Sequence, residues 1–130
     1  MRIVWLLILL VLMIPMIANA GETKILYYES KIPGPQITKA YYIKESLKKV
    51  DPKNPNVLQV KTYEIVTSPE GKTEYRTTQQ YNCETQTTTI VAYWSSGFGN
   101  DNGLMVDGIW RNVSDYDDAV MLSRKICPRQ

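Results

Sequence analysis

The chain has 130 residues and a net charge of +2, from 15 lysines and arginines against 13 acidic residues. This length corresponds to one small domain, and the near-neutral charge does not indicate DNA or RNA as the main partner. The sequence contains no histidine and only two cysteines, which excludes histidine-based catalysis, histidine zinc sites and thiolate metal cages. The composition therefore leaves little room for the commonest enzyme and metal chemistries.

Residues 1–20 are typical of a secretory signal peptide. Arg2 precedes an unbroken apolar run over residues 3–14, and Ala18-Asn19-Ala20 supplies the small residues that signal peptidase requires. A transmembrane anchor is the alternative, but the run is shorter than the roughly 18 to 20 residues of a membrane span. We therefore expect a mature domain of residues 21–130, with the net charge lowered from +2 to +1 by loss of Arg2. No cysteine lies near the cleavage site, so we expect an exported protein without a lipid anchor, either periplasmic or secreted and surface-associated.

Several segments have the β-branched and aromatic content of strands. In chain order they are residues 24–29, 38–43, 57–67, 73–83 and 85–94, with a short return strand expected over residues 104–110. Residues 45–50 fit either a helical turn or an edge strand. Proline, glycine and asparagine predict turns at residues 32–35, 51–56, 68–72 and 97–103.

The clearest helix follows Ser114, which is in place to cap its start, with Asp117 three residues further on. Aspartates in the first turn and Arg124 and Lys125 in the last turn complement the helix dipole. A stripe at helical spacing should pack on the sheet and consists of Tyr116, Ala119, Val120, Ser123 and Cys127, with Leu122 and Ile126 beside it. Pro128 is expected to end the helix.

In an exported domain, Cys83 and Cys127 are expected to form a structural disulfide. The alternative, a reactive thiol, lacks both a Cys-x-x-Cys partner and a histidine that would lower its pKa. Because one cysteine ends a strand and the other ends the helix, the bond would tie the helix to the sheet. The predicted fold class is α+β: an antiparallel meander sheet of about six strands, with one C-terminal helix packed on it and tied by this disulfide.

Sparse motifs in both halves of the domain carry a family resemblance. They are Tyr81-Asn82-Cys83, the strand through Ile90 to Trp94, Trp110-Arg111-Asn112-Val113-Ser114, the helix end Ile126-Cys127-Pro128, and the segment from Tyr41 to Lys49 with Ser46 at its centre. The chain resembles the surface-adhesin protein E-like family of Gram-negative bacteria, although Ile43 or Lys44 stands where that family's Tyr-x-Asp-x-x-Ser segment has aspartate. The resemblance implies a six-stranded antiparallel sheet, a disulfide-held helix, and an exported protein without catalytic residues or cofactors.

The founding member of that family is a surface lipoprotein that binds host extracellular-matrix and serum proteins. The resemblance thus implies a non-catalytic binding protein whose partner is a host matrix protein or an envelope protein, with a homodimer as a further possibility. A periplasmic accessory or inhibitor-like protein is the alternative. A third alternative is a small glycan-acting enzyme that uses Glu64 and Glu74, which would face each other across a hairpin turn.

Candidate partner residues come from two tyrosine pairs and a basic stretch. In each of the pairs Tyr27–Tyr28 and Tyr41–Tyr42, one ring should face away from the helix, and Tyr27 and Tyr41 are the candidates. Lys44, Lys48 and Lys49 form either a solvated segment or a contact for an anionic partner such as a sulfated glycan or lipopolysaccharide. The acidic clusters at residues 115–118 and 100–103 lack the ligand spacing of a calcium loop, so no metal site is assigned.

Overall fold

The computed structural model describes residues 21–30, 35–97 and 106–128. Its strands are β1 (Lys24–Ser30), β2 (Ile37–Ile43), β3 (Lys48–Lys49), β4 (Val57–Ser68), β5 (Gly71–Asn82), β6 (Thr87–Ser95) and β7 (Arg111–Asn112). Its helices are two 3-10 turns, η2 (Lys44–Ser46) and η3 (Val113–Asp115), and the α-helix α2 (Asp117–Ile126). The predicted signal peptide, residues 32–34 of the first predicted turn and residues 98–103 of the last lie outside the described residues.

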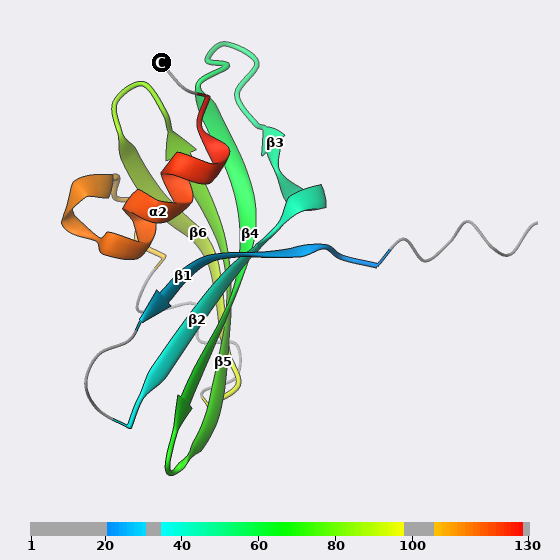
Figure 1. The fold of residues 1–130 in the computed structure, drawn as a ribbon. Coiled ribbons are helices and arrows are strands. Elements are labelled where there is room, and N and C mark those ends of the chain that lie inside the picture. The colour runs from blue at the N-terminus through cyan, green and yellow to red at the C-terminus, as the bar shows by residue number, and fades with distance from the viewer. Residues whose placement is uncertain (1–20, 31–34, 98–105, 129–130) are drawn as a thin grey trace, which may run out of the picture.

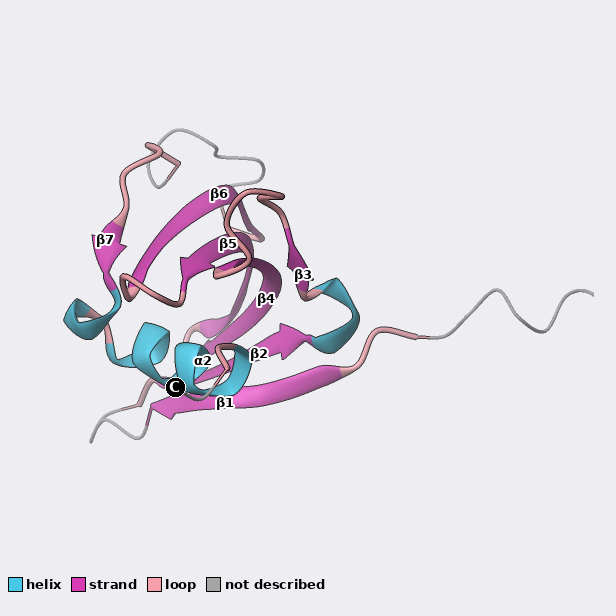
Figure 2. Ribbon diagram, turned by 90° about the horizontal axis from the view of Figure 1, so that it is seen from above, coloured by secondary structure: helices cyan, strands magenta, loops and turns pink. Residues whose placement is uncertain are grey.

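The strands form one antiparallel sheet in the order β1-β2-β4-β5-β6-β7, and β3 pairs with β4 beyond the end of β2. The sheet curls, and α2 lies on one side of it against β1 (Figures 1 and 2). The predicted α+β class, with an antiparallel sheet and one C-terminal helix, is confirmed. No helix of the described ranges is long and apolar enough to cross a membrane.

The five longer predicted strands are confirmed within a few residues, and the ambiguous segment 45–50 contains both alternatives in succession. Lys44–Ser46 form the 3-10 turn η2, and Lys48–Lys49 then pair with Gln59 and Leu58 of β4. The Ser46 hydroxyl donates to the carbonyl of Ile43 and accepts the N–H of Lys61, at 2.6 and 2.8 Å. The Ser46 side chain therefore bonds the part of β4 that lies between its pairing with β2 and its pairing with β3.

The return strand predicted over residues 104–110 is wrong where the structure describes it, since residues 106–110 contain no strand. The Asp107 carboxylate accepts the N–H of Ile109 at 3.0 Å and pairs with the Arg111 guanidinium. Gly108 adopts φ +70°, which side chains with a Cβ rarely take. These contacts close a turn, so pairing with β6 begins only at Arg111, opposite Thr88.

The predicted N-cap at Ser114 is also wrong. Ser114 lies within η3, and the extended Tyr116 occupies the N-cap position of α2, where its side chain makes no capping hydrogen bond. The N–H of Tyr116 instead bonds the carbonyl of Val113 at 3.1 Å, which closes the 3-10 turn. Of the predicted charges, Asp117 and Asp118 do lie in the first turn of α2, and Arg124 and Lys125 in its last.

The core lies between α2 and one face of the sheet. From the helix it takes Ala119, Leu122, Ser123 and Ile126, and from the rest of the chain Tyr27, Ala40, Tyr42, Val60, Tyr81 and Val113. Leu122 is completely buried, whereas Tyr116 of the predicted stripe is 45% exposed. The buried stripe is therefore centred on Leu122 and Ile126 rather than on Tyr116 and Val120.

The predicted disulfide between Cys83 and Cys127 is confirmed, with the two Cα atoms 5.6 Å apart. Cys83 directly follows β5 and Cys127 directly follows α2. The N–H of Cys83 also donates to the carbonyl of Asn56 at 2.9 Å. This hydrogen bond holds Cys83 at the open end of the β4–β5 hairpin, and the disulfide attaches Cys127 there. The C-terminal end of the helix is thereby fixed to the sheet.

Removal of the disulfide should lower the free energy of unfolding by about 4 kcal/mol, because it closes a loop between residues 44 positions apart. Urea unfolding of the exported protein and of the Cys83→Ser, Cys127→Ser double variant measures this loss. The same transition should be recovered from the wild type in reductant. Two free thiols in the exported wild-type protein, measured by mass under non-reducing conditions, would contradict the assignment.

Truncation of Leu122 tests the packing of α2. Leu122→Ala should cost about 3 kcal/mol, because a fully buried leucine leaves a cavity when it is shortened. Met121, its neighbour on the helix, is 37% exposed, so Met121→Ala should change stability by less than about 0.5 kcal/mol. Equal losses in the two variants would show that α2 does not pack through this stripe.

Candidate functional site

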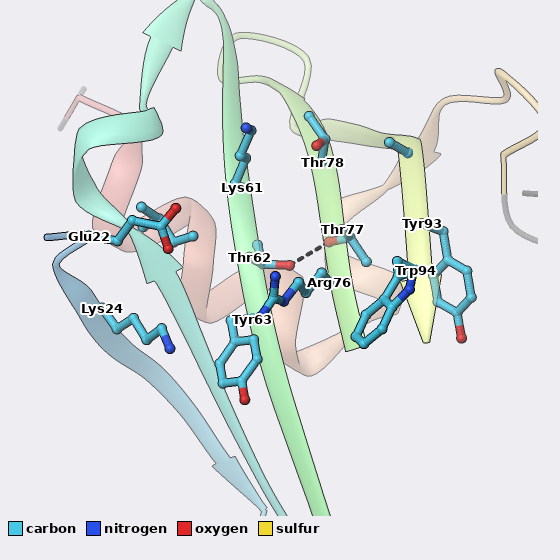
Figure 3. Close-up of a pocket in the computed structure, with 12 residues that line it drawn as sticks. Glu22, Lys24, Lys61, Thr62, Tyr63, Arg76, Thr77, Thr78, Tyr93 and Trp94 are labelled. Atoms are coloured by element: carbon cyan, nitrogen blue, oxygen red, sulfur yellow. Dashed lines mark hydrogen bonds between the residues drawn. The ribbon is translucent and has the colours of Figure 1, made fainter. Parts of the chain in front are cut away.

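The sheet face away from α2 carries a row of aromatic and cationic side chains. Tyr41 of β2 pairs with Tyr63 of β4, Tyr63 with Arg76 of β5, and Arg76 with Trp94 of β6. Successive side chains of a strand point to opposite faces, and Val60, three residues before Tyr63, is buried beneath α2. The four paired residues therefore share the opposite face, and Figure 3 shows Tyr63, Arg76 and Trp94 in front of the strands with the helix behind. We call Lys24, Tyr63, Arg76 and Trp94 the cation–aromatic row.

Cations and rings alternate along this row. The Lys24 ammonium lies 4.1 Å from the centre of the Tyr63 ring. The Arg76 guanidinium carbon lies 5.6 Å from the same ring and 5.4 Å from the Trp94 ring. All three distances lie within the range of cation–π attraction. Each cation is thus placed by at least one aromatic face, and Arg76 by two.

The row lines a groove of about 450 Å³ that opens on this face (Figure 3). Glu22 and Lys61 also line it. Tyr63 is only 8% exposed, so it is a wall packed into the surface rather than a projecting side chain. The groove combines aromatic surface with three cationic groups, which suits a partner that carries both apolar and anionic groups.

The Glu74 carboxylate, which lies near the row, already interacts with other side chains. Interaction with the Tyr63 hydroxyl, together with the Lys72 ammonium at 3.5 Å, lowers the pKa of Glu74. The ion pairs among the described residues are Lys72–Glu74 and Asp107–Arg111. Within that part of the chain, Lys24, Lys61 and Arg76 therefore have no carboxylate partner.

The structure separates the two predicted tyrosines. Tyr41 lies on the open face beside Tyr63, as predicted. Tyr27 is 5% exposed and belongs to the core, which corrects its assignment to a partner surface. Leu26 pairs with Tyr41 on the open face, so alternation along β1 turns Tyr27 to the helix side. The register then shifts, and Tyr28 pairs with the buried Ala40. Both Tyr27 and Tyr28 consequently pack on the helix side.

The basic stretch lies beside the groove. Lys44, Lys48 and Lys49 are all exposed. Lys44 directly follows Ile43, which lines the groove, and Ser46 of the same turn bonds the backbone of Lys61, another lining residue. The three lysines thus stand on a segment that borders one end of the candidate site.

Glu64 and Glu74, the pair considered for glycan chemistry, do not share a face. Glu64 pairs with Tyr75, so Glu74, the neighbour of Tyr75, points to the other side of the sheet. Glu64 faces α2, where burial and the nearby Asp118 carboxylate raise its pKa. The two carboxyl groups therefore cannot act together on one glycosidic bond, which requires both on the same substrate.

Sequence reasoning missed Lys24, Lys61, Tyr63, Arg76 and Trp94. The β4–β5 turn does predict that Tyr63 and Arg76 are neighbours. Ser68 and Gly71 form the last pair before this turn, and Tyr63 and Arg76 lie equally far from them along the two strands. The position of Trp94 had no such signal, because the pairing of β5 with β6 shifts between Thr78 and Gln79. No cluster of three or more potential metal ligands occurs within the described residues.

Comparison with known proteins gives no further constraint: no family model, no curated protein and no solved structure matches this chain.

The buried carboxyl group on the helix side generates a pH prediction. A raised pKa in the folded protein means that Glu64 favours folding while it is protonated, below its ordinary pKa near 4.5, and loses that contribution as the pH rises through the raised value. Glu64→Gln should therefore raise the thermal midpoint at pH 7 and leave it unchanged near pH 3.5, as thermal unfolding followed by circular dichroism would show.

The exposed Glu70 in the β4–β5 turn is the control, since Glu70→Gln should change neither midpoint. A Glu64→Gln midpoint at pH 7 equal to or below that of the wild type would contradict the burial of charge at this position.

Proposed function

We propose that this chain is a non-catalytic exported binding protein of the surface-adhesin E type and that its partner is a protein. The observation that carries the proposal is the cation–aromatic row on the sheet face that α2 leaves open. Tyrosine, tryptophan and arginine are the residues most often found at the energetic centres of protein interfaces. Here one of each lies side by side in a groove rather than scattered over the surface.

Two further features support export. A structural disulfide persists in oxidising compartments and is rare in the cytosol. The N-terminal 20 residues have the three parts of a signal peptide. The partner is then a host extracellular-matrix or serum protein if the domain is displayed at the surface, and an envelope protein if it remains in the periplasm.

Substitution of Trp94 in the row, and of Tyr41 beside Tyr63 on the same sheet face, tests the binding surface. Trp94→Ala and Tyr41→Ala should each weaken capture of the partner about tenfold or more, because truncation of central aromatic residues removes the largest contacts of an interface. Immobilised host matrix and serum proteins and a bacterial envelope extract are probed side by side with the wild type and the variants.

Tyr116→Ala is the matched control, since Tyr116 is 45% exposed beside α2 and lies outside the groove. Capture that is equal in all variants would refute the proposed surface. Protease treatment of intact cells then separates the two locations: digestion indicates a surface adhesin, and protection indicates a periplasmic accessory protein.

A further inference from the structure

We infer that the groove binds an acidic peptide segment of the partner, with carboxylates paired to Arg76, Lys24 and Lys61 and an apolar side chain against Tyr63 and Trp94. This inference rests on the proposed function, because it names the chemistry by which the same groove recognises a protein. It adds a requirement that the proposed function does not contain: the partner's binding segment must carry negative charge.

Arg76 is the centre of the argument. Its guanidinium lies between two aromatic rings, 5.6 Å from that of Tyr63 and 5.4 Å from that of Trp94, and it has no carboxylate partner in the described ranges. Stacking on aromatic faces holds the plane of a guanidinium while its N–H groups remain donors at the edge. A carboxylate accepts two such parallel bonds from arginine, and this geometry is the most specific contact that an arginine makes with an acidic residue.

The other two cations, Lys24 and Lys61, line the same groove. Lys24 lies 4.1 Å from Tyr63, on the strand β1, whereas Arg76 reaches it from β5. Lys61 precedes Tyr63 by two residues on β4 and therefore shares its face. Figure 3 shows Lys24 and Arg76 beside the Tyr63 ring and Lys61 further along β4, so the three cations are spread along the groove. Carboxylates on separate residues of an extended segment, with an apolar side chain between them, match this arrangement.

The pattern of negative charge favours a peptide over a uniform polyanion. Glu22 lines the groove, and Glu74 precedes Arg76 by two residues on β5 and shares its face, where the Tyr63 hydroxyl, Lys72 and Arg76 together lower the pKa of the Glu74 carboxyl. A sulfated glycan or an anionic lipid surface would bring negative charge to these carboxylates as well as to the cations, and like charges in contact are unfavourable. A peptide can place its acidic residues at the cations and neutral residues at Glu22 and Glu74.

The size of the groove is sufficient for such a segment. Its volume of about 450 Å³ falls in the range of about 300 to 1,000 Å³ that is typical of ligand sites. Two aromatic walls supply the apolar contact, and the cations supply the orientation, which is the usual division of roles in a binding site.

The test uses the mature domain with its disulfide intact and a random-heptapeptide library displayed on phage. The wild type should select sequences enriched in Asp and Glu with an apolar or aromatic residue between them. The affinity of a selected peptide, measured by fluorescence anisotropy, should fall about tenfold or more for Arg76→Gln. It should also fall when the acidic residues of the peptide are replaced by their amides, and when salt is raised from 50 to 500 mM.

Lys39→Gln is the matched control, because Lys39 is exposed on the same sheet face, beside Ile65, but does not line the groove. This variant should bind within about twofold of the wild type. Heparin and vesicles of phosphatidylcholine with phosphatidylglycerol are measured in parallel. The inference is overturned by selection without acidic residues, by affinity unchanged in Arg76→Gln, or by Arg76-dependent binding of heparin or vesicles in the absence of peptide binding.

Comparison with the capture experiment separates this inference from the proposed function. Partner capture that is lost in Trp94→Ala and retained in Arg76→Gln leaves the binding surface standing and refutes the acidic segment. Capture that is unchanged in both variants refutes the surface itself.

Discussion

The bond between Cys83 and Cys127 decides which face of the sheet is covered. A helix of 10 residues is too short to be stable alone, so α2 depends on packing and on its attachment at Cys127. Cys83 holds that attachment at the end of the longest hairpin, where β4 and β5 pair over 12 residues each. Because α2 is fixed against one face, every alternate residue of the central strands becomes core, and the residues between them form the open face.

The two faces are built from different interactions. Beneath α2, hydroxyl and amide groups satisfy one another: the Thr62 and Thr77 hydroxyls bond across the strands, Gln79 donates to Thr77 at 2.8 Å, and the Tyr81 hydroxyl donates to Gln79 at 2.9 Å. Burial raises the pKa of Tyr81 far above its usual range, so its hydroxyl stays protonated and remains a donor. The open face instead carries the exposed Arg76 and its aromatic neighbours, so the positive charge lies where water and partners reach it.

The sequence was sufficient for the parts of the structure that depend on local pattern. Alternation and turn residues predicted five strands, and the signal peptide led to the disulfide through the compartment that it implies. Three of the failures depend on how separate segments pair. The register shift after Leu26 places Tyr28 as well as Tyr27 on the helix side, whereas simple alternation would expose one of the two rings. Ser114 lies in the 3-10 turn η3, which begins at Val113. The N–H of Val113 donates to the carbonyl of Gln86, a long-range contact that the local sequence does not predict. To predict the row from sequence, both the β4–β5 and the β5–β6 registers must be known. Only the β4–β5 register can be counted from its hairpin turn, because the β5–β6 pairing contains a shift.

The energetic balance of the cation–aromatic row favours binding over folding. An exposed cation–π contact contributes about 0.5 to 1 kcal/mol. Fixing a lysine or arginine side chain costs up to about 2 kcal/mol of conformational entropy. The contacts of Lys24 and Arg76 therefore roughly offset the cost of ordering them and add little to the stability of the domain. That cost is already met in the free protein, so a partner that pairs with these cations loses less entropy on binding than it would with freely rotating side chains. Side chains that are ordered at no net gain to folding, and that have no carboxylate partner in the described part of the chain, are suited to binding a partner.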